Sequence, residues 1–350
     1  MYDANPQTGS KPFGRAPGPP MGFVFSGTAS EYFSIWIVNL ILSSLTLGIY
    51  SAWAKVRNNR YFYGSTSLDG ACFEYHATPM QILKGRLIAF ALILVYAIAG
   101  NLVPPLGLVL GLAWLFLVPV VINLSLRFNA RMSSYRNVHF DFEGSYGKAF
   151  LVFILLPIVA LVSLGLLAPY AHRETSRYLV QGYRFGGKSF NADLPVGGFY
   201  KIYLQAFGLL LAPVIVLFIV WGLGDMASLD EMAAIIPLAF YAIILLLAPF
   251  VRAKARNLIF SHASLEGGHR FSSSLNPWRY AWISASNLVL MVLSLGFLLP
   301  WARVRMARYM ADSTAVIPAG DLSGFVSQLA VNQQSFASEM ADMADVDIAL

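Results

Sequence analysis

One phrase of the sequence occurs three times, and each time it passes from apolar residues through a helix-breaking glycine to a run of bases. The three versions are TLGIYSAWAKVRNNRY (46–61), SLGLLAPYAHRETSRY (163–178) and SLGFLLPWARVRMARY (294–309). Aligned without a gap, residues 23–61, 140–178 and 271–309 share a leading Phe, a Leu-Gly pair, an Ala and a final Arg-Tyr pair. Unrelated apolar helices are not expected to match Gly, Arg and Tyr in register, so the sequence predicts an internal repeat.

Each copy of the phrase indicates a helix, a break and a second helix. The glycine of the break, Gly48, Gly165 or Gly296, supplies the left-handed backbone that ends many helices. Pro follows four residues later in two copies, where it favours the start of a new helix, and Ala52 stands there in the first copy. The second helix begins with an aromatic residue and is basic, which favours the membrane–water interface. The predicted basic interfacial collar consists of Lys55, Arg57, Arg60, His172, Arg173, Arg177, Arg303, Arg305 and Arg308.

Composition places the chain in a bilayer. Of its 350 residues, 57% are hydrophobic and only 12% are charged, whereas a soluble domain is nearer half apolar and a quarter charged. Four apolar stretches form two predicted transmembrane hairpins, 86–126 and 200–251. Their turns face away from the cytoplasm, because basic residues crowd the opposite ends. The three broken units, 23–61, 140–178 and 271–309, either cross once or dip in and return, which leaves four to seven full spans open.

Turn residues followed by aromatic residues lie between these stretches. The segments SLDGACF, SYRNVHF, FGGKSF and SLEGGHRF predict four short cytoplasmic β-hairpins that pair with one another into a small sheet. The predicted fold class is therefore an all-α polytopic membrane protein. It is built from internal repeats of broken helices that alternate with transmembrane helical hairpins, and the short β-hairpins are an addition to it.

The two ends of the chain differ from its middle. Residues 1–22 are rich in Pro, Gly and polar groups and predict a disordered cytoplasmic N-terminus. Residues 23–309 form the predicted repeat-built transmembrane domain. Residues 310–350 contain six acidic residues and no Lys or Arg, and predict an acidic, amphipathic tail. This tail either docks on the basic cytoplasmic surface of the protein or is weakly ordered. Its apolar residues at helical spacing are Leu322, Phe325, Leu329, Phe336, Met340 and Met343.

The first broken unit and its surroundings carry a family signature. Residues 23–75, FVFSGTASEYFSIWIVNLILSSLTLGIYSAWAKVRNNRYFYGSTSLDGACFEY, resemble the YjgN-like bacterial inner-membrane proteins, a family of unknown function. The matching motifs are TLGIY, the WA after it, RY, and LDG followed by F, and the resemblance extends over about 23–309. Ala52 is a departure, because that family commonly has Pro there. The resemblance implies a multi-pass protein of the bacterial inner membrane and implies no particular activity.

Few residues are candidates for a functional site. Catalytic signatures are absent, and the single Cys72 excludes a cysteine-based zinc site, so we predict no enzyme activity, cofactor or metal. Asn39 and Asn287 occupy equivalent places in apolar stretches of the first and third units. Hydrogen bonding between helices explains them. The alternative is a polar pathway lined by Asn39, Asn287 and the helix breaks at Gly48, Gly165 and Gly296.

Two classes of function remain. The first is a transporter or channel for a small anionic or neutral solute, based on the broken units and the basic helices. The second is a non-transporting membrane scaffold or sensor that binds a partner at its cytoplasmic face, based on the tail. The expected partners are the lipid bilayer and either a second copy of the chain or a cytoplasmic protein. The net positive charge follows the bias of cytoplasmic loops, so no nucleic acid is expected.

Overall fold

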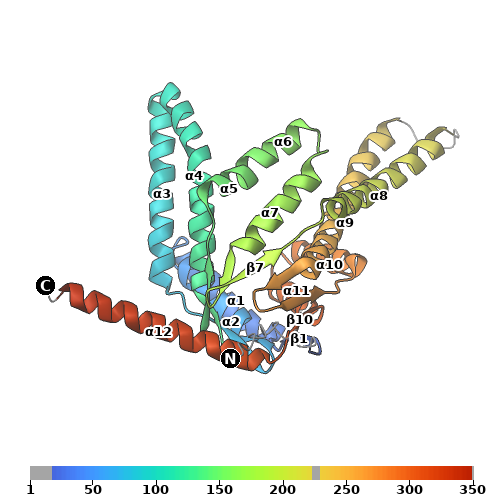
Figure 1. Cartoon of the computed structure of the whole chain (residues 1–350). Coiled ribbons are helices and arrows are strands. Elements are labelled where there is room, and N and C mark those ends of the chain that lie inside the picture. The colour runs from blue at the N-terminus through green and yellow to red at the C-terminus, as the bar shows by residue number, and fades with distance from the viewer. Residues whose placement is uncertain (1–17, 223–228, 349–350) are drawn as a thin grey trace, which may run out of the picture.

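A closed barrel of ten antiparallel strands forms the centre of the computed structural model, which describes residues 18–222 and 229–348. Along the chain, a strand leads into a helical hairpin, and the hairpin returns to a strand that pairs with the first. Successive strands run in opposite directions. All helical hairpins therefore leave from one rim of the barrel, the helix rim, and the tight β-turns lie at the other, the turn rim (Figure 1).

Long and short strands alternate around the barrel. The long strands are β1 (Met21–Phe25), β3 (Ala71–Tyr75), β5 (Val138–Phe142), β7 (Lys188–Ala192) and β9 (His269–Ser273). The short strands are β2 (Thr66–Leu68), β4 (Ser133–Tyr135), β6 (Tyr183–Phe185), β8 (Ala263–Leu265) and β10 (Thr314–Ile317). Pairing of β1 with β10, at Met21↔Val316 and Gly22↔Ala315, closes the barrel, so each strand has a partner on both sides.

Five helical hairpins stand on the helix rim. The first two are α1 (Ala29–Leu45) with α2 (Ser51–Gly64), and α3 (Pro79–Leu102) with α4 (Pro104–Arg131). The third consists of α5 (Tyr146–Phe150), the π-helical η1 (Leu151–Leu155), α6 (Leu156–Val162) and α7 (Ala168–Gly182). The last two are α8 (Val196–Gly222) with α9 (Leu229–His262), and α10 (Pro277–Leu293) with α11 (Leu299–Asp312). Each hairpin contacts the next, and α11 contacts α1, so the hairpins also form a ring.

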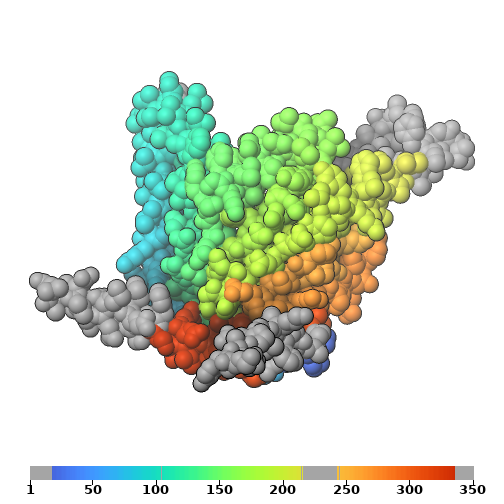
Figure 2. Space-filling view, in the orientation of Figure 1, coloured from blue at the N-terminus to red at the C-terminus, as the bar shows by residue number. Residues whose placement is uncertain are grey.

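The final helix, α12 (Leu322–Ile348), lies across the turn rim, on the opposite side of the barrel from the hairpins (Figure 1). In the space-filling view the α3–α4 hairpin rises above the neighbouring surface, and the first part of α12, in red, covers the base (Figure 2). The molecule therefore has one face made of helical hairpins and one face made of β-turns and a single helix.

The all-α fold class predicted from the sequence is wrong. The four predicted β-hairpins are present and pair with one another, but the sheet also recruits β1 and β10 and closes into a barrel. These two strands are five and four residues long and come from opposite ends of the chain. Local periodicity carries no signal for such a distant pairing, which is why the sequence did not reveal the barrel.

The structure also shows how the predicted segments are used. Residues 1–17 lie outside the described part of the chain, and β1 begins before the predicted boundary at 23. The predicted tail contributes β10 to the barrel, and α12 packs against it.

Within the described residues, two helices are long and apolar enough to cross a membrane, Pro79–Leu102 and Pro105–Arg131, which match the predicted hairpin 86–126. The predicted hairpin 200–251 corresponds to α8 and α9, and part of its turn lies outside the described residues.

All three broken units fold back on themselves with the same backbone at the tip. In the third unit Leu295 and Gly296 have left-handed φ angles of 50° and 90°. The hydroxyl of Ser294 accepts the backbone N–H of Leu298 at 3.0 Å, which fixes the start of the second helix. The same arrangement recurs around Leu47-Gly48 and Leu164-Gly165. The Ser/Thr-Leu-Gly motif thus ends one helix and orients the next.

The tips of these three hairpins are apolar and project away from the rest of the protein. Leu47, Leu164 and Leu295 are 96%, 94% and 89% exposed. Clustered apolar side chains of this kind mark a surface that contacts something other than water. The three broken units thus each end in an exposed apolar tip.

Candidate functional site

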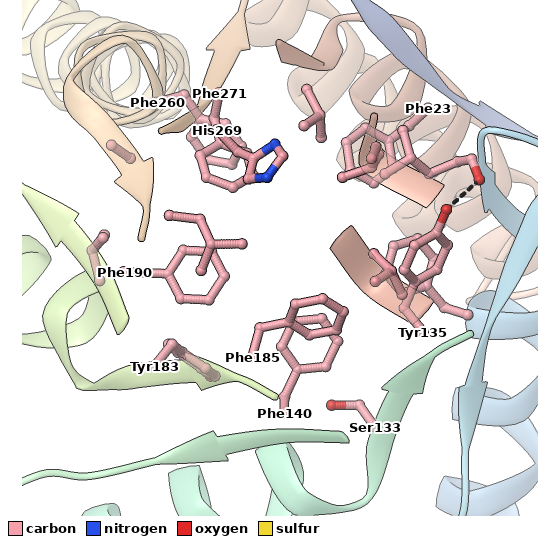
Figure 3. Close-up of a pocket in the computed structure, with 18 of the residues that line it drawn as sticks. Phe23, Ser133, Tyr135, Phe140, Tyr183, Phe185, Phe190, Phe260, His269 and Phe271 are labelled. Carbon is pink, nitrogen blue, oxygen red and sulfur yellow. Dashed lines mark hydrogen bonds between the residues drawn. The ribbon is translucent and has the colours of Figure 1, made fainter. Parts of the chain in front are cut away.

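A ring of five phenylalanines lines the inside of the barrel. Each is the central residue of one long strand: Phe23, Phe73, Phe140, Phe190 and Phe271. Side chains alternate between the two faces of a strand, and the central phenylalanine of each long strand lies on the inner face. Figure 3 shows Phe140, Phe190 and Phe271, from three different strands, around an open centre.

The phenylalanine ring surrounds a cavity of about 440 Å³, which we call the lumen. This volume lies within the range of small-molecule pockets, ~300–1,000 Å³. Phe23 and Phe73 stack with ring centroids 5.9 Å apart, and Phe190 and Phe271 lie 5.7 Å apart. The five rings are only half-buried. Large aromatic side chains that are half-exposed inside a closed barrel indicate a place for a ligand.

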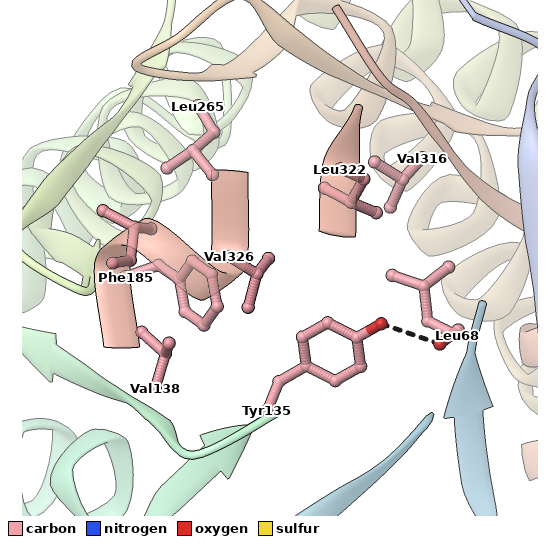
Figure 4. Close-up of a cluster of buried hydrophobic side chains, with 9 residues drawn as sticks. Leu68, Tyr135, Val138, Phe185, Leu265, Val316, Leu322 and Val326 are labelled. Carbon is pink, nitrogen blue, oxygen red and sulfur yellow. Dashed lines mark hydrogen bonds between the residues drawn. The ribbon is translucent and has the colours of Figure 1, made fainter. Parts of the chain in front are cut away.

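The turn-rim end of the lumen is closed by α12. Leu322, Val326 and Leu329 lie on one face of this helix and are buried against the barrel. Figure 4 shows Val326 between Tyr135 and Leu265, and Leu322 beside Val316. The side-chain oxygen of Gln333 accepts the backbone N–H of His139 at 3.0 Å, one turn further along. Within the described residues, apolar side chains of α12 therefore hold the predicted tail against the barrel.

Side chains from three helical hairpins line the helix-rim end of the lumen. They include Tyr63 on α2, Val180 on α7 and Phe260 on α9. A molecule in the lumen therefore contacts the bases of the helical hairpins as well as the strands. This end faces the part of the protein that carries the predicted membrane spans.

The lumen is uncharged at neutral pH. Among the described residues that line it, the polar side chains are Tyr63, Ser133, Tyr135, Tyr183 and His269. Burial raises the pKa of both Tyr135 and Tyr183, so their hydroxyls stay protonated. The Tyr135 hydroxyl donates to the Leu68 carbonyl at 2.7 Å (Figure 4). Burial lowers the pKa of His269, whose Nδ1 accepts the backbone N–H of Ala319 at 3.3 Å.

Hydrogen bonds tie each helical hairpin to the next around the helix rim. In each case the second helix of one hairpin donates to a backbone carbonyl at the end of the next long strand or in the loop that follows it. The donors and acceptors, at 2.8–3.3 Å, are Arg60 to Tyr75 and Ala77, Arg127 to Phe142, Arg173 to Leu194, and Asn257 to Leu275. Arg308 of the last hairpin donates to the Gly27 carbonyl after β1 at 3.1 Å and completes the circle.

The Arg-Tyr pairs that end the first and third repeated phrases have a structural use in this circle, whereas in the second unit Arg173 rather than Arg177 makes the contact. In the third unit Arg308 binds the loop of the neighbouring hairpin, whereas the Tyr309 hydroxyl donates to the carbonyl of Asn276 in its own hairpin at 3.2 Å. In the first unit Tyr61 likewise donates to the Thr28 carbonyl at 2.8 Å. Adjacent residues thus hold two loops at once.

The predicted basic collar does not form one surface. Arg60, Arg173 and Arg308 belong to the circle of backbone contacts described above. Among the others, Lys55 is exposed and Arg177 is half-buried. The remaining four contact side chains: Arg57 with Tyr50, His172 with Tyr203, Arg303 with Tyr32, and Arg305 with Ser286 and Asn287.

The residues of the predicted polar pathway are not brought together. Asn39 donates to the side-chain oxygen of Asn58 at 3.2 Å, and Asn287 donates to the carbonyl of Ala302 at 3.0 Å. Both asparagines are buried between the two helices of their own hairpin. They therefore form the hydrogen bonds between helices that are one of the two roles predicted from the sequence. The helix breaks lie at three separate tips, at Gly48, Gly165 and Gly296.

Sequence reasoning missed the lumen, although its signal is visible. Phe73, Phe140 and Phe190 end the predicted β-hairpin segments SLDGACF, SYRNVHF and FGGKSF, and Phe140 also begins the second repeated unit. Each sits at the centre of a five-residue strand, between residues that point outward. An aromatic residue at the same inward position of every hairpin indicates a shared interior.

A family model described as "Bacterial protein of unknown function (DUF898)" matches residues 20–343. The chain belongs to this family. The DUF898 match covers the barrel, all five helical hairpins and most of α12.

Three relatives of this DUF898 chain are named "Inner membrane protein YjgN". The protein from Salmonella typhimurium is 25% identical over 354 residues, 85% of this chain and 88% of the relative. Those from Escherichia coli O157:H7 and strain K12 are each 33% identical over 149 residues, 42% of this chain and 37% of the relative. These names confirm the YjgN-like resemblance and support an inner-membrane location. No solved structure matches the chain.

Proposed function

We propose that this DUF898-family chain is a multi-pass inner-membrane protein that takes a hydrophobic molecule from the bilayer and binds it in the lumen. The observation that carries the proposal is the ring of five half-buried phenylalanines around a cavity of about 440 Å³. One end of this cavity is closed by α12, so it has the form of a pocket rather than an open pore. A carrier of hydrophobic cargo is the function that this pocket supports best.

The chemistry of the lumen favours an apolar cargo over an anionic one. The described residues that line it carry no charge at neutral pH, and the asparagines of the predicted polar pathway lie elsewhere. Lipid tails are as apolar as aliphatic side chains. The burial of apolar surface therefore contributes little free energy when a hydrophobic molecule moves from the bilayer to the lumen. Selectivity then rests on shape and on a few hydroxyls, among them those of Tyr63 and Tyr183 at the helix rim.

The test is retention of hydrophobic ligands by the full-length protein. Wild-type protein extracted from the membrane in polymer-bounded lipid discs is stripped of bulk lipid, and the molecules that remain are identified by native mass spectrometry. Ala263→Phe places a ring into the lumen from β8, and Val24→Phe adds the same ring on the outer face of β1. We expect Ala263→Phe to lower retention about tenfold, equivalent to ~1.4 kcal/mol, and Val24→Phe to leave it unchanged. Equal retention by all three proteins would contradict the proposal.

A second candidate function, a scaffold or sensor with a cytoplasmic partner, has support from α12. This helix runs from Leu322 to Ile348, or ~40 Å at ~1.5 Å per residue. Gln333 contacts the barrel at His139, and the helix continues beyond the barrel in Figure 1. Truncation after Gln333 should reduce the size of the native membrane complex if this arm recruits a partner. An unchanged complex with intact ligand retention would exclude the scaffold role and leave the carrier role.

A further inference from the structure

A second cavity of about 410 Å³ lies outside the lumen, between α10, α11 and the start of α1. Three guanidinium groups line this groove, those of Arg279, Arg305 and Arg308, together with the rings of Trp282 and Trp301. We propose that the groove binds the phosphate group of a phospholipid, with the lipid tails directed toward the tip of the α10–α11 hairpin.

The charges of the groove are suited to a phosphate. None of its three arginines forms an ion pair within the described part of the chain. The lining contains one carboxylate, that of Asp312. Three guanidiniums and one carboxylate leave the groove positively charged. Planar guanidinium groups match the geometry of phosphate oxygens and bind them through paired N–H donors.

The arginine side chains are already held in place. Nη1 of Arg305 donates to Ser286 at 2.8 Å and to Asn287 at 3.1 Å, and the guanidinium lies over the Trp301 ring, 5.0 Å from its centroid. The Arg279 guanidinium lies 5.1 Å from the centroid of Tyr309. A guanidinium has five N–H donors. These contacts therefore position the groups and still leave donors for a ligand, at a lower entropic cost than for free side chains.

The groove lies at the depth of a lipid headgroup. Arg305 and Arg308 follow the start of α11 at Leu299 by six and nine residues, or ~9 and ~14 Å of helix. The hydrocarbon of one leaflet is ~15 Å deep. If the exposed tip at Leu295 enters the hydrocarbon, the guanidiniums reach the headgroup layer. Trp282, eleven residues or ~16 Å before the end of α10 at Leu293, then lies in the interfacial zone where tryptophan is enriched.

An apolar path connects the groove with the tip of the hairpin. Ile283 and Val304 line the groove beside the arginines. Further along α10, Val289 and Val292 are 50% and 66% exposed. A free phosphate would use the guanidiniums alone, whereas a phospholipid would also cover this apolar surface. The combination favours a lipid headgroup over a soluble anion.

The first hairpin supplies a control for the loss of one arginine outside the groove. Arg57 occupies the same place in the repeated phrase as Arg305. It is exposed and donates to Tyr50 at 3.2 Å, outside the groove. Removing Arg57 therefore takes one arginine from a basic second helix without changing the proposed site.

The experiment measures phospholipid binding to the full-length protein in the Ala263→Phe background, in which binding in the lumen is weakened. The probe is phosphatidylglycerol, added to delipidated protein in detergent and counted by native mass spectrometry. We expect Arg279→Ala to weaken binding at least tenfold, Arg279→Lys to restore part of it, and Arg57→Ala to have no effect. Unfolding midpoints confirm that the variants fold.

Two results would overturn the proposal. An equal loss in Arg57→Ala and Arg279→Ala would show general attraction between a basic protein and an anionic lipid. Displacement of phosphatidylglycerol by equimolar inorganic phosphate would show that the groove is a site for soluble phosphate. Binding that survives millimolar phosphate and depends on Arg279 supports the lipid site. None of these results depends on which molecule the lumen holds.

Discussion

Two phenylalanines on β5 show how two layers of the barrel differ. Phe142, at the helix rim, is 0% exposed and packs against Tyr178 and Tyr183, with ring centroids 5.8 and 5.3 Å away. Gly182 makes room for it, because an added Cβ there would lie 2.4 Å from the Phe142 ring. Phe140, two residues earlier on the same face of the strand, is half-buried and lines the lumen.

The comparison teaches that the hollow is a consequence of barrel width. Both layers contain the same large residue, so a shortage of bulky side chains does not explain the cavity. A barrel of ~8 strands is just wide enough for its side chains to fill or to hold one small ligand. This barrel has ten strands. Helical hairpins fill it at one rim and α12 fills it at the other, and the middle layer stays open.

The largest expected effect comes from truncating these two phenylalanines. Phe142→Ala should lower the free energy of unfolding by ~3–5 kcal/mol, the usual cost of removing a fully packed ring. Phe140→Ala should cost about 1 kcal/mol, since half of its ring is already outside the packed interior. Tryptophan fluorescence during denaturant unfolding in detergent measures both. Equal losses would mean that the lumen is packed and would remove the distinction between the layers.

The closure by α12 should also be sensitive to a single side chain. Leu329 is 4% exposed against the barrel, whereas Val331, two residues later, is 61% exposed. Leu329→Ala should weaken docking of the helix by ~2 kcal/mol or more, and Val331→Ala should have little effect. The rate of proteolytic cleavage within α12 reports its release. Cleavage at the same rate in both variants would show that the helix is not held by its apolar face.

Removing one hydrogen bond from the circle of contacts at the helix rim should lower the free energy of unfolding by an intermediate amount. Arg127→Ala leaves the backbone carbonyl of Phe142 without its 3.2 Å donor, which should cost ~1–3 kcal/mol. Arg131, on the same helix, forms an exposed ion pair with Asp141 at 2.9 Å, and Arg131→Ala should cost less than ~1 kcal/mol. Denaturant unfolding of both variants tests this order. The reverse order would show that the circle does not hold the hairpins together.

The smallest effect should be a dependence of α12 docking on pH. Burial lowers the pKa of His269 below its ordinary 6.5, and its ring lies 4.4 Å from that of Phe325 on α12. Between the lowered pKa and 6.5, the unfolded state binds more protons than the folded one, so stability falls as pH falls through this window and is constant above it. Cleavage of α12 should therefore be faster at pH 5.5 than at 7.5. His269→Phe should remove that difference, and a difference that persists would assign it to another group.

The parts of the fold that the sequence predicts are those encoded by neighbouring residues. The Ser/Thr-Leu-Gly breaks depend on hydrogen bonds within a few residues, and the β-hairpins depend on turns such as Asp69-Gly70, where both residues have positive φ. The pairing of β1 with β10 spans nearly the whole chain and has no local signal. The recurring phenylalanine of each hairpin is visible in the sequence, but the five residues form a ring only after the barrel closes.

The two buried asparagines show a second limit of prediction from the sequence. Asn39 and Asn287 stand out in apolar stretches, and either helix contacts or a pathway accounts for them in sequence. Only the positions of Asn58 and Ala302, on the returning helices, decide between the two. The breaks were located correctly, but the direction of the returning helix was left open by the sequence.

The central claim, that the lumen is an apolar pocket connected to the bilayer, is tested most directly by a spin label inside it. Phe190→Cys in a Cys72→Ser background places the label in the lumen, and Val24→Cys places it on the outer face of β1. In lipid vesicles, relaxation of the Phe190→Cys label should be enhanced more by lipid-soluble oxygen than by a water-soluble nickel chelate, and the Val24→Cys label should show the opposite preference. A lumen label that responds mainly to the nickel chelate would show a water-filled cavity and would contradict the account.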